Sequence, residues 1–293
     1  MSDGRRCRGR ARLMYVDSHV HFWALSRGDY GWLKPSNPVL YRDYLPEHLL
    51  PKLQERGVEG VIAVQAAPTE AEARFLLELS LRYPIVVGVS AGLDPFAATF
   101  AASIERLRES PAFKGVRLNG SDFLRAQADE EARSKLEEAL RLMERARLTL
   151  DVLLRPDALA AVAERLSETP ALRCVVNHLG CPGAGSGEPR DARWSEGMKR
   201  LAALPSVSAK LSGMLTLSER PEPLRPYVDE LFDRFGSARL LFGSDWPVAL
   251  QAGGYDDVVE RFESLLPAGL GADELRLLRA GNARRIYGLG DGE

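Results

Sequence analysis

The sequence is poor in cysteine, has no long apolar segment and shows no excess of charge of either sign. Its 293 residues include only 3 Cys, without CxxC spacing. This argues against a disulfide framework and a cysteine-based zinc site, and it favours a reducing, cytoplasmic location. No segment approaches the ~18–20 apolar residues of a membrane-spanning helix, so no membrane association is expected. The net charge of −2 and the pI of about 6.2 give no general basic field for nucleic acid.

Charge is uneven only near the N-terminus. Residues 1–12 contain five Arg and one Asp, a side-chain charge of +4, so the remainder carries −6. Such a segment is typical of a nucleic-acid or targeting arm, or of a disordered extension. Because no apolar segment follows it, we interpret residues 1–13 as a disordered basic tail. Residues 14–293 then form a single domain of a length common among α/β barrels.

Short apolar segments alternate with amphipathic ones along this domain. The eight predicted strands are Tyr15–Val20, Gly60–Gln65, Ile85–Ala91, Phe113–Leu118, Thr149–Leu153, Arg173–Asn177, Val207–Leu211 and Arg239–Gly243. Each is followed by a helical pattern, and a final helix is predicted over Ala272–Ala280. Continuously apolar strands are typical of a parallel sheet buried on both faces. The pattern predicts an α/β protein with a (β/α)8 TIM barrel. A doubly wound sheet is less favoured because no G-x-G-x-x-G follows the first strand.

Four residues able to carry chemistry lie at predicted strand ends. His19 and His21 close the first strand, where residues i and i+2 share a face, while His178 follows the sixth strand and Asp245 the eighth. Active sites of TIM barrels lie at the carboxyl ends of the strands, and the first and eighth strands are neighbours. A single histidine there could be structural, and an aspartate before Trp-Pro could shape a turn. The combination predicts a site.

Cationic residues lie near other strand ends. Arg117 and Arg155 end the fourth and fifth strands, and Lys210 stands near the end of the seventh. An Arg at a barrel mouth can bind a carboxylate bidentately or donate to sugar hydroxyls. The alternative is an ion pair within the rim. All three are candidate substrate-binding residues.

Aromatic residues are concentrated in the loop after the first strand. Residues 22–44 hold Trp23 and five other aromatic side chains, and Trp246 follows Asp245. Aromatic faces suit the apolar side of a sugar ring, so Trp23 and Trp246 are candidate substrate contacts, although loop packing explains them equally well. The Gly-rich loop Pro182–Arg193 is expected to act as a lid.

Nine short motifs occur in a characteristic order between Tyr15 and Leu289. They are VDSHVHFW (16–23), YGWL (30–33), YRDYLPEHL (41–49), VQAAPTEAEARFLLEL (64–79), FKGVR (113–117), HLGCP (178–182), KLSG (210–213), LLFGSDWPV (240–248) and NARRIYGL (282–289). Together they resemble the amidohydrolase superfamily, and within it the lactonases of the L-fuconolactonase and L-rhamnonolactonase type. The resemblance implies a TIM-barrel hydrolase that opens a sugar-acid lactone by attack of water on the carbonyl. It also implies that His19, His21, His178 and Asp245 occupy active-site positions.

Lactone hydrolysis needs a base for the water and stabilisation of an oxyanion. Asp245 is the candidate catalytic base, and the histidine cluster, His178 included, would polarise the carbonyl directly or through a divalent ion. The two first-strand histidines, His178 and Asp245 form a reasonable ligand set for one zinc ion. Metal-loaded relatives present further ligands after the fourth and fifth strands, where this chain has Arg117 and Arg155. A binuclear centre is therefore not expected, whereas one zinc ion and metal-free catalysis both remain open.

Two other enzyme functions remain as alternatives. A lactonase for a carboxylated lactone of aromatic degradation, such as 2-pyrone-4,6-dicarboxylate, would need several convergent cations. Arg117 is well placed for this, but Met214 stands where another Arg would help. A metal-dependent decarboxylase would need a histidine at the end of the fifth strand, and this chain has none there. A non-catalytic barrel is disfavoured because it would be expected to lack polar residues at the strand ends, whereas His19, His178 and Asp245 are present. The expected partner is a small-molecule lactone, with no nucleic acid and no membrane, and a homodimer is a further expectation.

Overall fold

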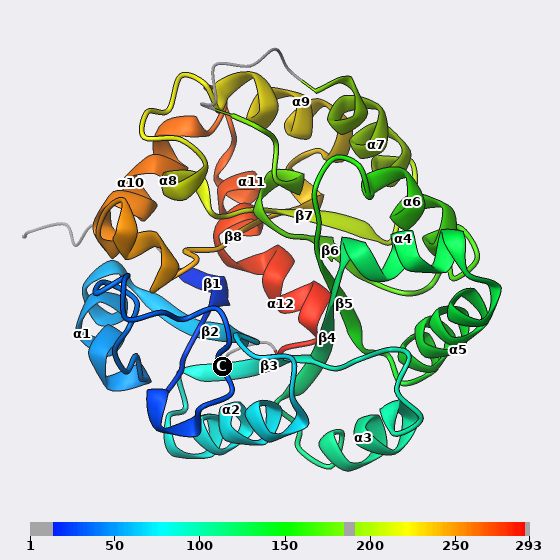
Figure 1. Cartoon of the computed structure of the whole chain (residues 1–293). Coiled ribbons are helices and arrows are strands. Elements are labelled where there is room, and N and C mark those ends of the chain that lie inside the picture. Colours follow the sequence, from blue (N-terminus) through cyan, green and yellow to red (C-terminus); the bar gives the residue numbers. More distant parts are fainter. Residues whose placement is uncertain (1–13, 185–190, 291–293) are drawn as a thin grey trace, which may run out of the picture.

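The computed structural model describes residues 14–184 and 191–290 (Figure 1). The predicted basic tail, residues 1–13, lies outside the described residues, as do residues 185–190 of the predicted lid and the last three residues. Within the described ranges, no helix is both long and apolar enough to cross a membrane.

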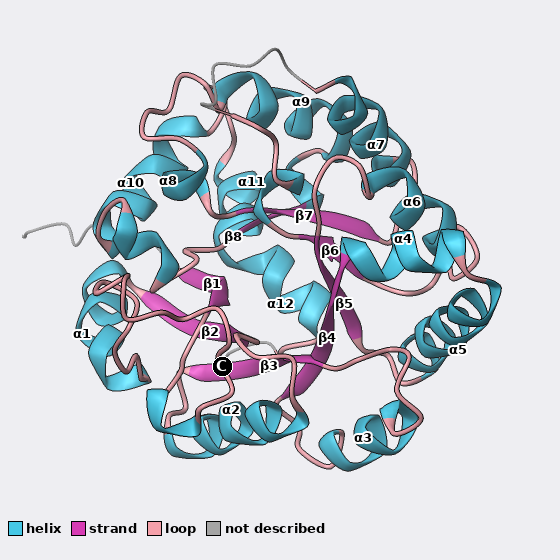
Figure 2. Cartoon of the chain, in the orientation of Figure 1, coloured by secondary structure: helices cyan, strands magenta, loops and turns pink. Residues whose placement is uncertain are grey.

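Eight parallel strands form one sheet in the order of the sequence, and helices surround it (Figure 2). The strands are β1 Tyr15–Val20, β2 Val58–Val64, β3 Val86–Gly92, β4 Phe113–Asn119, β5 Thr149–Leu153, β6 Cys174–Val176, β7 Val207–Leu211 and β8 Leu240–Phe242. Val20 of β1 pairs with Trp246, just beyond β8, in a parallel bridge that brings the first and last strands together. The predicted (β/α)8 barrel is confirmed, with each strand within two residues of its predicted bounds.

The helices of the described residues begin and end where local chemistry favours it. They are α1 Pro46–Arg56, α2 Glu70–Arg82, α3 Phe100–Leu107, α4 Gly120–Ala128, α5 Glu130–Arg145, α6 Leu159–Leu166, α7 Ala192–Ala202, α8 Met214–Leu217, α9 Arg225–Phe235, α10 Tyr255–Leu265, α11 Ala272–Arg276 and α12 Asn282–Tyr287. The Thr69 hydroxyl accepts from the Glu72 amide at the start of α2, and Asp129 caps α5 in the same way. Gly57 ends α1 in the left-handed conformation.

Three helical features differ from the prediction, the first being the four-residue helix α8, which was not predicted. Helix α4 was not predicted, because its nine residues bury only Gly120, Phe123 and Ala126 and give a weak apolar period. The final predicted helix, Ala272–Ala280, is also corrected: α11 ends at Arg276, a π-helical turn follows over Leu277–Gly281, and α12 continues the chain.

Helix α12 closes the amino-terminal end of the barrel. It lies across the centre of the ring (Figure 1), and the Thr149 hydroxyl, at the start of β5, donates to the Ile286 carbonyl. The Asn282 amide donates to the Ser237 and Leu240 carbonyls at 2.7 and 2.8 Å. The buried Tyr287 side chain joins an apolar cluster inside the barrel with Val16, Ile62, Val64, Val175 and Leu241. Chemistry is therefore confined to the carboxyl ends of the strands.

Candidate active site

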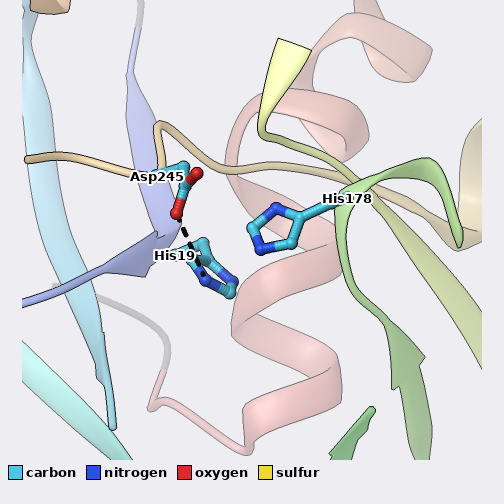
Figure 3. Close-up of side chains that lie close together, drawn as sticks. All are labelled: His19, His178 and Asp245. Atoms are coloured by element: carbon cyan, nitrogen blue, oxygen red, sulfur yellow. Dashed lines mark ion pairs between the residues drawn. The ribbon is translucent and has the colours of Figure 1, made fainter. Parts of the chain in front are cut away.

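The four residues predicted from strand ends meet at the carboxyl-terminal mouth of the barrel. One donor atom each from His19, His178 and Asp245 lies within 4.8 Å of the others, and all three side chains are buried. Figure 3 shows His178 pointing from the end of β6 toward Asp245 and His19. Asp245 Oδ1 lies 3.7 Å from His19 Nε2 and 3.4 Å from His21 Nε2. A carboxylate and three imidazoles thus share one small buried volume.

Unusual backbone conformations hold two of these residues. His178 and Asp245 have φ of +50° and +59°, in the left-handed region that non-glycine residues rarely adopt. Such strain costs roughly 1–3 kcal/mol per residue and is concentrated at functional sites. Gly213 follows β7 at φ +65°, and a Cβ there would lie 2.9 Å from His178 Nδ1. The hydroxyl of Ser212 lies 3.0 Å from the same nitrogen, so the end of β7 fixes the His178 ring.

Asp17, on β1, ties the first strand to the segment after β8. Its Oδ1 accepts from the backbone amides of His19 and Ser244 at 3.1 and 2.9 Å, and its Oδ2 accepts from the Tyr255 hydroxyl at 3.0 Å. The Asp245 amide donates to the His19 carbonyl at 2.8 Å. Burial raises the pKa of Asp17 to about 6 despite these donors. Asp17 therefore acts as a brace beneath His19 and Asp245, a role that its place in the VDSH motif did not reveal.

The surroundings of the site lower the pKa of the Asp245 carboxyl and of two of the imidazoles, for different reasons. Burial raises the pKa of Asp245, but His178, His21 and the Arg117 guanidinium outweigh it and hold that pKa below its usual range. Burial lowers the pKa of His178 to about 4 and that of His19 well below its usual value. These directions favour an ionised Asp245 carboxylate beside neutral rings of His19 and His178 at neutral pH. The carboxylate can accept a proton, and the rings can donate or accept hydrogen bonds or bind an ion.

Lys210 lies beneath the site and not at its rim. Its ammonium is fully buried and donates to Asp151 Oδ1 at 2.6 Å, with His19 Nδ1 at 3.2 Å. Asp151, on β5, also accepts from the hydroxyl of Ser90 and the amide of Asn177. Burial raises the pKa of Asp151, but Lys210 and these donors outweigh it and leave the pKa below its usual range. Sequence reasoning missed Asp151, although a charged residue inside the apolar segment TLDVL was a usable signal.

Comparison with known proteins agrees with this geometry. The model of a family described as amidohydrolase matches residues 16–289. This chain belongs to the amidohydrolase family. It is 34% identical over 278 residues to an L-fucono-1,5-lactonase of Burkholderia ambifaria, an alignment that covers 93% of this chain and 94% of that one. An L-fucono-1,5-lactonase of Burkholderia multivorans is 34% identical over 292 residues, covering 94% of this chain and 96% of the relative.

Solved structures of amidohydrolases share the fold. A Burkholderia multivorans amidohydrolase crystallised with bound zinc superposes with a TM-score of 0.82 at 33% identity and covers 94% of this chain and 99% of that one. A structure described as a 2-pyrone-4,6-dicarboxylic acid hydrolase from Pseudomonas putida superposes with a TM-score of 0.73 at 22% identity, covering 96% and 99%. At 22% identity, the similarity to the Pseudomonas putida structure shows a shared fold alone.

The two predicted substrate-binding arginines, Arg117 and Arg155, differ in burial. Arg117 is buried at the end of β4, where it donates through one terminal nitrogen to the Gln65 carbonyl at 3.2 Å. Its Nε is buried and has no partner among the described residues. Arg155 is exposed and lines a cleft of about 540 Å³ at the ends of β4 and β5, together with Cys181. Arg117 and Arg155 thus lie on the side of the mouth where β4 and β5 end.

The two predicted aromatic contacts pack the loop after β1. Trp23 is fully buried, and its Nε1 donates to the Arg42 carbonyl at 2.7 Å. Trp246 is 4% exposed and meets the rings of Phe22 and Tyr44 edge-on, with centroids 6.0 and 5.2 Å apart. Burial leaves neither indole face open to solvent. The structure therefore shows both side chains packed against the loop after β1, and their predicted contact with substrate stays a prediction.

The residues of this amidohydrolase fit one divalent ion. His19, His178 and Asp245 offer imidazole nitrogen and carboxylate oxygen, the donor types that zinc accepts, within a span that one ion could bridge. A second ion would need further ligands at the ends of β4 and β5. This chain has Arg117 and Arg155 there, which cannot bind a cation, so the site is consistent with one ion and not two. The nearby charges of Arg117 and Lys210 oppose a cation, and the carboxylates of Asp245 and Asp151 partly balance them.

Proposed function

We propose that this amidohydrolase opens a sugar-acid 1,5-lactone of the L-fucono-1,5-lactone type to the aldonic acid. The observation that carries the proposal is the buried carboxylate of Asp245 at the barrel mouth, with its Oδ1 3.7 Å from His19 Nε2 and 3.4 Å from His21 Nε2. Identity of 34% over more than nine-tenths of two L-fucono-1,5-lactonases supports the substrate class. The two free cysteines among the described residues, Cys174 and Cys181, are in keeping with a cytoplasmic enzyme.

Asp245 would be the base of the reaction. It would take a proton from a water molecule as the water oxygen forms a bond to the lactone carbonyl carbon. The tetrahedral intermediate then breaks its bond to the ring oxygen, and Asp245 returns the proton to that oxygen. The net result is addition of one water and conversion of the ring ester to a hydroxy acid.

Neighbouring residues would stabilise the negative charge that develops on the carbonyl oxygen. Arg117 carries a buried Nε–H without a partner among the described residues, so a donor to that oxygen is available. Ser212 and Gly213 hold the ring of His178, which would orient the lactone. We propose zinc as the ion that His19, His178 and Asp245 would hold, in keeping with the zinc-bound structure of a relative. Such an ion would supply Lewis-acid polarisation of the carbonyl.

The cleft beside the site favours a hydroxylated substrate over a dicarboxylate. Its polar lining consists of Asn119, Ser121, Arg155 and Asp157, which suit sugar hydroxyls. A dicarboxylate would need paired cations directed at one point. Lys210 is not available for this, because Asp151 binds its buried ammonium.

The proposal is tested by proton release from a panel of lactones, followed with a pH indicator. Sugar-acid 1,5-lactones are expected to be hydrolysed well above their spontaneous rate. Turnover of carboxylated lactones alone would replace the proposal with the dicarboxylate function. Absence of turnover across the panel, with the protein folded and supplied with Zn²⁺, would contradict a lactonase function.

A further inference from the structure

A cleft of about 250 Å³ lies at the amino-terminal end of the barrel, opposite the candidate active site. Its lining includes Lys114, near the start of β4, Arg147, just before β5, and Arg173, just before β6. Ser110 and Gly288, which follows α12, also line it. Among the described residues that line the cleft, none is an aspartate or a glutamate. The cleft therefore gathers positive charge around one small space.

The three cations bond to neutral groups and not to acidic ones. Within the described residues, neither Lys114, Arg147 nor Arg173 takes part in an ion pair. Lys114 Nζ donates to the Gly288 carbonyl at 3.2 Å, and one terminal nitrogen of Arg173 donates to the Arg147 carbonyl. A carbonyl group is a dipole without net charge, so these hydrogen bonds leave three positive charges unbalanced.

These charges are close enough to oppose one another. Burial and the charge of Arg173 lower the pKa of Lys114, and burial and the charge of Arg147 lower the pKa of Arg173. Arg108 also lines the cleft, but it pairs with Glu105 at 3.2 Å. An anion in the cleft would turn the repulsion among the other three cations into attraction.

The backbone at Arg147 is an independent observation. Helix α5 ends in a Schellman motif, in which the amides of Arg147 and Leu148 donate to the carbonyls of Glu144 and Met143, both at 3.0 Å. The motif holds Arg147 in the left-handed conformation, with φ +56°, where glycine is the usual residue. The helix end alone would therefore favour glycine, whereas an anion in the cleft favours the arginine.

We propose that this cleft binds a phosphate group between Lys114, Arg147 and Arg173. A guanidinium presents paired N–H donors that match two phosphate oxygens, and an ammonium adds a compact charge. A phosphate monoester carries a charge of about −1.5 to −2 at pH 7, so it offsets three cations better than a single carboxylate does. The cleft is smaller than the ~300–1,000 Å³ pockets of drug-sized ligands. Its ligand is therefore free phosphate or the phosphate group of a small metabolite. This site is separate from the proposed lactonase function.

The test is isothermal titration calorimetry of the full-length protein with inorganic phosphate and, separately, with glucose 6-phosphate, at constant ionic strength. We expect saturable binding of one phosphate group per chain, and weaker binding of acetate, which carries a single charge. Tighter binding of glucose 6-phosphate would support a phosphorylated metabolite as the ligand, and tighter binding of inorganic phosphate would support the free ion. Absence of saturable binding of both would overturn the inference.

Arg147→Gly is the most informative variant, because glycine suits the left-handed backbone at this position. It should remove one cation without loss of stability in urea unfolding. Because hydrogen bonds to charged groups are strong, phosphate binding should weaken by ~10–100-fold, and Arg173→Met should weaken it similarly. Lys199→Met, on the exposed face of α7, is the matched control and should keep the wild-type affinity. Wild-type affinity in both arginine variants would place the phosphate elsewhere and overturn the inference.

The acidic residues Asp291 and Glu293 end the sequence and lie outside the described residues. A variant that ends at Gly290 tests whether they compete for the cleft. This variant should bind phosphate with the wild-type affinity. Phosphate binding that appears only in the shortened variant would contradict an external phosphate as the ligand of the full-length chain.

Discussion

Gly213 offers a direct test of how the fold places His178. It has φ +65° and ψ 14°, and a Cβ there would lie 2.9, 3.2 and 3.3 Å from Nδ1, Cγ and Cβ of His178. Gly213→Ala would force a side-chain carbon into a left-handed residue, at a cost of about 1–2 kcal/mol. Overpacking against the His178 ring adds about 1–3 kcal/mol. The ring must therefore shift by several tenths of an ångström.

Gly28 provides the matched control. It has φ 73° and ψ 1°, nearly the same conformation, but a Cβ there would meet no atom within 4 Å. Gly28→Ala should lose only the ~1–2 kcal/mol of backbone strain, as measured by urea unfolding. Gly213→Ala should lose more and should lower kcat/KM by ~100-fold, because small misplacements of a catalytic group are costly.

The assay is lactone hydrolysis followed with a pH indicator, at a temperature where both variants are folded. Turnover by Gly213→Ala equal to that of Gly28→Ala would refute the reasoning. His178 would then tolerate displacement and could not be a precisely placed part of the site.

Two further predictions concern groups outside the immediate site. Glu72 is fully buried, one of its oxygens has no hydrogen-bond partner among the residues that the structure describes, and burial raises its pKa from 4.5 to about 8. Between these values only the unfolded state loses the proton, so stability should fall as pH rises, by up to about 1.4 kcal/mol per pH unit. Glu72→Gln should flatten this slope in urea unfolding between pH 5 and pH 8; parallel profiles would contradict the shift. Arg155→Ala should raise KM several-fold with little change in unfolding free energy, because Arg155 is exposed in the cleft. An unchanged KM would remove Arg155 from substrate binding.

The barrel could be predicted because each buried strand is a continuous apolar segment of five or so residues. The site could be predicted because His19, His178 and Asp245 lie within three residues of the carboxyl ends of such segments. The left-handed backbones of His178 and Asp245 could not be predicted, because His and Asp give no signal for positive φ comparable to that of Gly213.

The layer beneath the site was harder to predict. Lys210 is the penultimate residue of β7, and sequence position alone does not tell whether an inward side chain reaches the mouth or the layer below. Its partner Asp151 lies on another strand, so only the fold brings the charges together. Asn177, at the end of the sixth predicted strand, belongs to the same layer, because its amide donates to Asp151 at 2.9 Å.

The central claim is that Asp245 is the base of a lactonase. The measurement is the initial rate of L-fucono-1,5-lactone hydrolysis by the wild type and by Asp245→Asn, with thermal unfolding recorded for both. Because general-base catalysis typically contributes ~10²–10⁴-fold, the variant should lose activity by that factor while remaining folded. A folded Asp245→Asn protein that retains most of the wild-type rate would contradict the account.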